Sequence, residues 1–178
     1  MSSIYAASRR GESCRRSPRE VPKIAGSAGG RRDHRIVTGI DGSASSLSAL
    51  RWAIHLARCT GAAVDVVAVW RCPVCVGGCG RASAGAGHRY AFAEIAEKIV
   101  AEAIGDALGA GGEVRARAWV VEGDPAQVLL DASDGADLLV VGSQRDGGLT
   151  GAMLGSVSQH CVHHACCPVV VIRGEDHD

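Results

Sequence analysis

A glycine-rich segment near the end of the chain has the residue types and spacing of a phosphate-binding loop. It comprises Gly142, Ser143, Arg145, Gly147, Gly148, Gly155, Ser156 and Val157. An apolar run precedes it and a short helical pattern follows Gly155. Glycines let backbone N–H groups approach an anion, and the first N–H groups of a helix carry a partial positive charge. The segment therefore predicts a nucleotide-binding site.

The chain from Arg35 onward alternates apolar runs with amphipathic stretches. The runs rich in β-branched residues are predicted strands: Arg35 to Ile40, Ala63 to Trp70, Val114 to Val121, Asp137 to Val141 and Pro168 to Arg173. The stretches between them are predicted helices: Ala44 to Thr60, His88 to Ala110, Pro125 to Ser133 and Ser156 to Ala165. Such alternation predicts an α/β fold, a Rossmann-like, doubly wound, five-stranded parallel sheet with helices on both faces.

Two motifs resemble those of the universal stress protein family. One is Gly142-Ser143 with Gly155-Ser156 thirteen residues after Gly142, followed by His163-His164-Ala165-Cys166-Cys167-Pro168. The other is the run from Ile36 to Ser43, a strand that ends in Asp41 and a small-residue turn. The resemblance covers about residues 35 to 173. It implies strand order 3-2-1-4-5, ATP as the ligand, with or without Mg²⁺, and a homodimer formed through Val169 to Ile172.

In that order the first and fourth strands are neighbours whose connections diverge, so Gly39 and Asp41 would face the same crevice as Gly142. The resemblance places Asp41 at the ribose or at a metal, and the backbone of Ala68 or Val69 at the adenine. Asp41 has an alternative role, because Asp41 and Ser43 are both suited to cap the helix that begins near Ala44.

Arg145 departs from the family's ATP-binding motif, which has a second glycine at this position. If that position requires a positive φ, arginine is strained there by roughly 1–2 kcal/mol. Alternatively, the guanidinium pairs with a phosphate through two parallel hydrogen bonds. Both outcomes are compatible with a bound nucleotide.

No sequence motif indicates a dedicated enzyme. The chain lacks Gly-x4-Gly-Lys-Ser/Thr, and Lys98 is the sole lysine of residues 35–173. We expect no catalytic residue and, at most, slow ATP hydrolysis or autophosphorylation. The sequence thus favours an ATP-binding stress-response regulatory protein, whose nucleotide occupancy tunes its conformation, dimerisation or partner binding.

Cysteine supports an alternative function on the same fold. The chain has eight cysteines, and Cys72, Cys75 and Cys79 cluster after the second predicted strand, with His88 beyond them. Three thiols and an imidazole can hold zinc, and closely spaced thiols can act in redox chemistry. The paired Cys-x2-Cys spacing of common zinc sites is incomplete, however. A redox or zinc module with a weakened nucleotide site is therefore the alternative.

Histidines are concentrated in the last predicted helix, where His160 and His164 lie one turn apart and His163 lies between them. We interpret this helix mainly as an element that closes against the sheet, as the resemblance implies. A metal bound by these imidazoles is the competing interpretation.

The net charge of zero conceals a basic N-terminus, where residues 1–35 hold nine Lys or Arg and three Asp or Glu. We interpret residues 1–34 as a disordered tail, 35–174 as the nucleotide-binding domain and 175–178 as a short tail. The tail lacks interleaved aromatic residues, so only nonspecific contact with nucleic acid is expected from it. No apolar run approaches the roughly 20 residues that span a bilayer, and we expect a cytoplasmic protein without membrane contact.

Overall fold

A computed structural model describes residues 34–71, 86–109, 113–143 and 154–174 of the chain, with residues 86–92 described by their backbone alone. In chain order the elements are β1 Arg35–Ile40, α1 Ala44–Thr60, β2 Ala63–Trp70, α2 Ala86–Leu108, β3 Ala116–Glu122, α3 Pro125–Ser133, β4 Leu138–Gly142, α4 Ser156–His164 and β5 Val169–Ile172. The predicted order of strands and helices is confirmed. The predicted ends of five elements differ from the observed ones by one or two residues.

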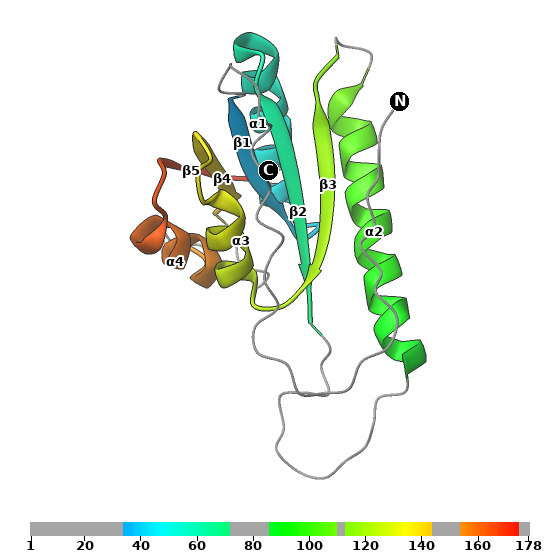
Figure 1. Ribbon diagram of the computed structural model, residues 1–178. Helices are drawn as coiled ribbons and strands as arrows, with labels where there is room; N and C mark the ends of the chain where they lie inside the picture. The colour runs from blue at the N-terminus through cyan, green and yellow to red at the C-terminus, as the bar shows by residue number, and fades with distance from the viewer. Residues whose placement is uncertain (1–33, 72–85, 110–112, 144–153, 175–178) are drawn as a thin grey trace.

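The strands form one five-stranded sheet in the order β3-β2-β1-β4-β5, and each pair is parallel. Figure 1 shows α2 covering the face of the sheet beside β3, and α3 and α4 lying together on the opposite side. The two buried clusters follow this division, because one contains residues of α1 and α2 and the other residues of α3 and α4. The doubly wound fold and the strand order are thereby confirmed.

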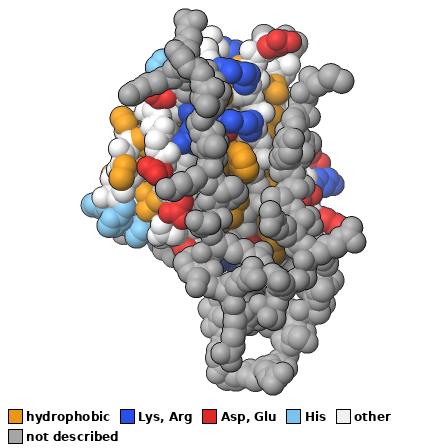
Figure 2. Space-filling model, in the orientation of Figure 1, with side chains coloured by type: hydrophobic (Ala, Val, Ile, Leu, Met, Phe, Trp, Pro, Cys, Tyr) orange, Lys and Arg blue, Asp and Glu red, His pale blue; other side chains and the backbone are white. Residues whose placement is uncertain are grey.

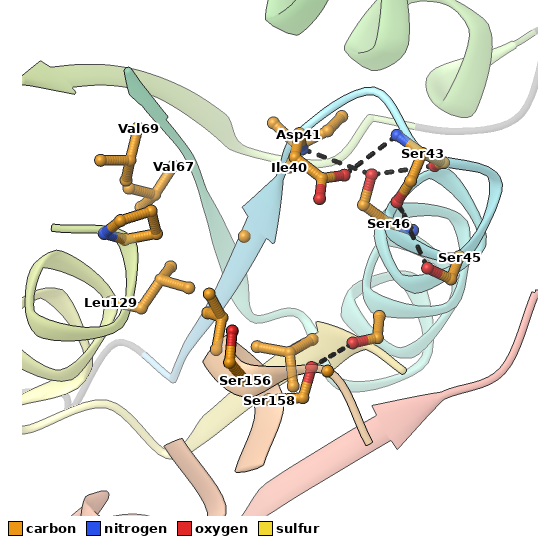
Figure 3. Close-up of a pocket in the computed structure, with 16 residues that line it drawn as sticks. Ile40, Asp41, Ser43, Ser45, Ser46, Val67, Val69, Leu129, Ser156 and Ser158 are labelled. Atoms are coloured by element: carbon orange, nitrogen blue, oxygen red, sulfur yellow. Dashed lines mark hydrogen bonds between the residues drawn. The ribbon is translucent and has the colours of Figure 1, made fainter. Parts of the chain in front are cut away.

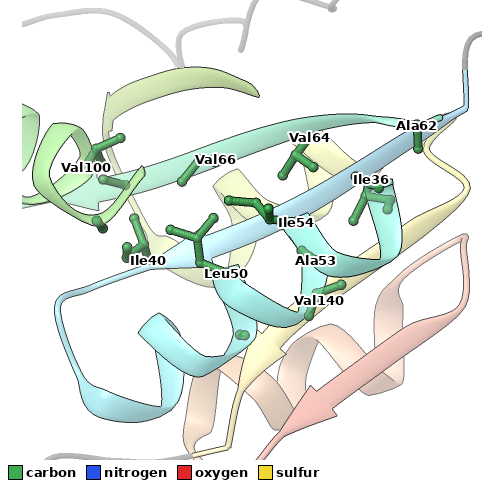
Figure 4. Packing of buried hydrophobic residues seen from close by; sticks show 14 of the residues in the cluster. Ile36, Ile40, Leu50, Ala53, Ile54, Ala62, Val64, Val66, Val100 and Val140 are labelled. Atoms are coloured by element: carbon green, nitrogen blue, oxygen red, sulfur yellow. The ribbon is translucent and has the colours of Figure 1, made fainter. Parts of the chain in front are cut away.

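The larger cluster lies between α1, α2 and the sheet (Figure 4). Leu50 and Ile54 of α1 are fully buried there, beside Val66 of β2 and Val140 of β4. Burial of each such side chain contributes roughly 1.5–3 kcal/mol relative to exposure. This packing fixes α1 over the centre of the sheet and so fixes where the helix begins.

Two of the helices begin with a side-chain cap. Ser43 precedes α1 and its Oγ accepts a hydrogen bond from the N–H of Ser46 at 3.2 Å. Asp124 precedes α3 and accepts from the N–H groups of Ala126 and Gln127 at 3.1 and 3.2 Å. These bonds satisfy N–H groups that a helix start leaves without an intrahelical partner.

A buried carboxylate joins three strands at the amino end of the sheet, a feature that the sequence analysis missed. The side chain of Asp65 on β2 is completely buried. It accepts hydrogen bonds from Arg35 of β1 at 3.2 Å and from Nε of Arg117 of β3 at 2.7 Å. A buried charge is tolerated when it is paired and hydrogen-bonded in this way.

No helix in the described part of the chain is long and apolar enough to cross a membrane. The cluster Cys72, Cys75 and Cys79 lies outside the described residues, as does the side chain of His88.

Candidate functional site

A cavity of about 340 Å³ opens where β1 and β4 end side by side. From these two strands the chain continues into α1 and α4, which lie on opposite faces of the sheet. Figure 3 shows the serines of α1 on one side of the cavity, with Val67, Val69 and Leu129 across from them. The lining residues are Gly39, Ile40, Asp41, Ser43, Ser45, Ser46, Val67, Val69, Pro125, Leu129, Val141, Gly142, Gly155, Ser156, Val157 and Ser158.

Most of the predicted site residues that the structure describes line this one cavity. They are Gly39, Asp41, Val69, Gly142, Gly155, Ser156 and Val157. Ala68 does not line it, because its side chain packs into the cluster beneath α1 and α2. Ser143 follows the lining residue Gly142 and does not itself line the cavity. Arg145, Gly147 and Gly148 lie outside the described residues.

The cavity also contains residues that the sequence analysis missed. Ser45 and Ser46 enter from the first turn of α1, Val67 from β2, and Pro125 and Leu129 from α3. A period-two pattern could have identified Val67, because alternate strand residues share a face and Val67 therefore accompanies Val69. No comparable signal exists for α3, which is brought to the site by the tertiary fold.

Asp41 is the sole ionisable side chain among the described residues that line the cavity. Its Oδ1 accepts a hydrogen bond from the N–H of Ser43 at 3.0 Å. Burial opposes its ionisation, but hydrogen bonds from Ser43 and Ser46 outweigh burial and lower the pKa of Asp41 below its usual value. Because Ser43 caps α1, Asp41 is not needed as the cap and presents a carboxylate to the cavity.

Two glycines at the cavity lie in close packing, one against backbone and one against the end of a side chain. A Cβ on Gly142 would lie 2.7 Å from the carbonyl carbon of Ser45 and 2.8 Å from the nitrogen of Ser46. A Cβ on Gly39 would lie 2.8 Å from Cδ1 of Leu129. Gly142 thus lets the end of β4 touch the first turn of α1, and Gly39 lets α3 approach β1.

The start of α4 differs from the starts of α1 and α3. Gly155 occupies the cap position and makes no side-chain hydrogen bond, so no cap side chain accepts from the first N–H groups of α4. Ser156, Val157 and Ser158 of this first turn line the cavity. Free N–H groups at a helix start, together with the helix dipole, favour an anion. The cavity therefore combines an anion-binding helix start with one carboxylate and an apolar wall.

The two ends of segment 144–153 are held together by backbone hydrogen bonds. The N–H of Gly155 donates to the carbonyl of Ser143 at 3.0 Å, and the N–H of Ser143 donates to the carbonyl of Ile172 at 2.7 Å. In addition, the hydroxyl of Ser158 donates to the carbonyl of Gly142. The cavity is thereby connected to the last residue of β5.

Two of the described cysteines, Cys161 and Cys167, do not have the properties of reactive thiols. Cys161 is completely buried, and burial together with the nearby Cys167 raises its pKa to about 11. Burial likewise raises the pKa of Cys167. Thiolates are the reactive form, so neither thiol is activated at neutral pH. Within the described residues, no group of three or more His, Cys, Asp or Glu could hold a metal ion.

Comparison with known proteins reveals relatives over most of the chain. The model of the universal stress protein family matches residues 34–173. A universal stress protein of Mycolicibacterium smegmatis is 34% identical over 155 residues, which cover 81% of this chain and 49% of that protein. The chain spans about half the length of the first curated relatives it matches.

Two solved structures are also similar. A universal stress protein family member from Burkholderia pseudomallei is 26% identical with a TM-score of 0.58, covering 81% of this chain and 98% of that one. A universal stress protein in complex with cAMP is 25% identical with a TM-score of 0.52, covering 78% of this chain and 95% of that one.

Proposed function

The chain belongs to the universal stress protein family, a family of stress-response proteins, and from this premise we propose that its cavity binds ATP. Nucleotide occupancy then tunes the conformation of the chain, its dimerisation or its binding to a partner. The observation that carries the proposal is the start of α4, which faces the cavity and has no side-chain cap.

The first turn of α4 is suited to hold the phosphates. Its N–H groups point along the helix axis toward the cavity, and the hydroxyl of Ser156 lies at the first helical position. Anion binding through backbone N–H groups needs no lysine, which agrees with the absence of a Gly-x4-Gly-Lys motif. Backbone groups of segment 144–153 and the side chain of Arg145 would complete the phosphate site.

The backbone of Val69, rather than that of Ala68, is suited to the adenine edge. In a parallel sheet, alternate residues direct N–H and C=O to opposite neighbours. The N–H of Ala63 donates to His34, so the odd-numbered residues of β2 face β1. β1 ends at Ile40, which pairs with Ala68, and β2 continues beyond it. By this register the N–H of Val69 falls opposite the carbonyl of Ile40, and the C=O of Val69 is the polar group that lies beyond the end of β1.

The apolar wall formed by Val67, Val69, Pro125 and Leu129 is suited to contact the adenine ring. Asp41 lies across from this wall and carries an ionised carboxylate at neutral pH. A carboxylate accepts hydrogen bonds from ribose hydroxyls and is also a ligand that Mg²⁺ prefers. Asp41 would repel phosphates, so its place is at the ribose or at a phosphate-bound Mg²⁺.

Calorimetric titration of the nucleotide-free chain with ATP, ADP and AMP, with and without Mg²⁺, tests this function. Cyclic AMP belongs in the same series, because a similar solved protein holds cAMP. The expected result is one ATP site per chain. Absence of binding by every one of these nucleotides at millimolar concentration would refute the proposal.

The cysteine alternative is separated by a double variant, Cys72→Ser with Cys75→Ser. If the cavity is the functional site, this variant binds ATP with unchanged affinity. Alternatively, the segment that carries Cys72 and Cys75 is a zinc or redox module on a scaffold that no longer binds nucleotide. In that case the variant loses zinc binding or thiol oxidation, and the parent chain does not bind ATP.

A further inference from the structure

Three histidines lie together on the exposed side of α4, the helix whose other end lines the cavity. The rings of His160 and His164 have their centres 4.4 Å apart, and those of His163 and His164 are 6.4 Å apart. All three side chains are exposed. Figure 2 shows the histidine side chains gathered at the edge of the molecule over α4. Neither the nucleotide site nor the core uses them.

We infer that His160 and His164 form a chelating site for a divalent transition metal ion such as Ni²⁺, Cu²⁺ or Zn²⁺. Residues one helical turn apart share a face, and paired imidazoles at this spacing are an established way for a helix to bind such ions. With metal–nitrogen bonds of about 2.0–2.1 Å, two imidazoles on one ion have ring centres roughly 4.5–5 Å apart. The observed separation of 4.4 Å between the ring centres is close to this range.

The position in the helix also favours a cation. His164 is the last residue of α4, and the free carbonyl groups at a helix C-terminus carry a partial negative charge. Both imidazoles are exposed, so ligation requires no opening of the core. The ring centre of His163 is 6.4 Å from that of His164, against 4.4 Å for His160 and His164, which makes the latter two the better placed pair.

The site has two protein ligands, because the described residues contain no cluster of three or more metal-binding side chains. Water fills the remaining positions. Ring centres close to 4.5 Å correspond to neighbouring positions about 90° apart, as in the tetragonal or octahedral geometries of Cu²⁺ and Ni²⁺. Within the divalent series, affinity at such a nitrogen site rises from Ni²⁺ to Cu²⁺.

Calorimetric titration of the untagged chain with Ni²⁺ tests the site. Ni²⁺ is the appropriate probe because softer ions also seek thiolates, and Cys59 and Cys166 are exposed. His160→Gln and His164→Gln are each expected to weaken Ni²⁺ binding by about tenfold or more, because each leaves a single imidazole in place of a chelating pair. Glutamine keeps the helix propensity high, and circular dichroism verifies that each variant is folded.

His163→Gln is the matched control, because it removes an exposed imidazole of the same helix while leaving the pair intact. Its Ni²⁺ affinity should remain within about twofold of that of the parent chain. The inference is overturned if the His160 and His164 variants bind Ni²⁺ as the parent does, or if the control loses as much affinity as they do. ATP titration of the same variants is independent of this outcome, since the histidines do not line the cavity.

Discussion

At the scale of single residues, Asp41 and Ser43 divide two roles that the sequence could not separate. Both are good helix caps, but only Ser43 occupies the cap position of α1, and it also donates its N–H to Asp41. Asp41 is therefore held as an ionised carboxylate at the cavity. Which of the two residues caps α1 depends on the backbone conformation of residues 41–43, and residue types alone do not determine that conformation.

The described cysteines provide a prediction at the same scale. During iodoacetamide labelling at pH 8, Cys59 and Cys166 should react, because both are exposed. Cys161 should remain unmodified, because it is completely buried and its pKa is raised to about 11. Its thiolate, and hence its labelling, should increase as the pH approaches 11.

Peptide mass spectrometry measures the modification at each cysteine, and the denatured chain labelled at the same pH provides the control. In the denatured chain all three thiols should react. Labelling of Cys161 in the native chain at the rate of Cys166 would contradict the burial that the structure assigns to it.

The residue types of the glycine-rich segment and of the β1 turn were sufficient to predict six lining residues of the cavity, and the family resemblance added Val69. The remaining lining residues are set by alternation and by tertiary packing. Val67 follows from the period of two along β2, whereas Leu129 reaches the site because α3 packs against β1 and β2. The packing of α3 against the sheet depends on the fold as a whole, and no pattern in the local sequence predicts it.

At the scale of secondary-structure elements, periodicity predicted β1, α1, β2 and α3 with their observed bounds. It did not predict the ion cluster that joins β1, β2 and β3. Asp65 interrupts an apolar run, and its partners Arg35 and Arg117 are 30 and 52 residues away. A charged residue within a buried strand indicates an unusual environment, but its partners emerge only from the strand register.

Removal of this carboxylate should destabilise the sheet strongly. Asp65→Ala leaves Arg35, whose side chain is only 13% exposed, without its buried counter-charge. The free energy of unfolding should fall by about 3–5 kcal/mol, as measured by urea denaturation. Glu94→Ala, which removes an exposed carboxylate of α2, should change it by less than about 0.5 kcal/mol. A loss below about 1 kcal/mol for Asp65→Ala would show that the cluster contributes little.

At the scale of the whole molecule, the open edge of β5 is the proposed site of dimerisation. All four residues of β5 are partly exposed, and within the described part of the chain β5 pairs with β4 alone. The carbonyls of Pro168 and Ile172 accept from Leu139 and Ser143, so even-numbered residues of β5 face β4. Val169 and Val171 therefore direct their N–H groups to the open edge, where a second copy could pair.

Val171→Pro should convert the dimer into a monomer, because proline removes an edge N–H without breaking the ladder to β4. Val171→Ala is the matched control, since it shortens the same side chain and keeps the N–H, and it should remain dimeric. Sedimentation equilibrium measures both. A Val171→Pro chain that dimerises as well as Val171→Ala would exclude pairing through this edge.

The proposed dimer edge and the cavity are connected through the hydrogen bond from Ser143 to Ile172. A shift of Ser143 on nucleotide binding would therefore act directly on Ile172, the last residue of β5. This connection gives the proposed regulation a physical route, and it makes nucleotide binding at α4 the claim on which the account depends.

The most direct test of that claim is ATP binding by Gly155→Asp compared with the parent chain. Gly155 has φ −59° and ψ 154°, which any residue adopts, and aspartate is a preferred helix cap. Its carboxylate would cap α4 and take the N–H groups offered to phosphate. The account predicts one ATP site in the parent and a loss of about 100-fold or more in the variant, with an unchanged circular dichroism spectrum verifying that the buried position accepts the aspartate. Equal ATP affinity in the two chains would contradict it.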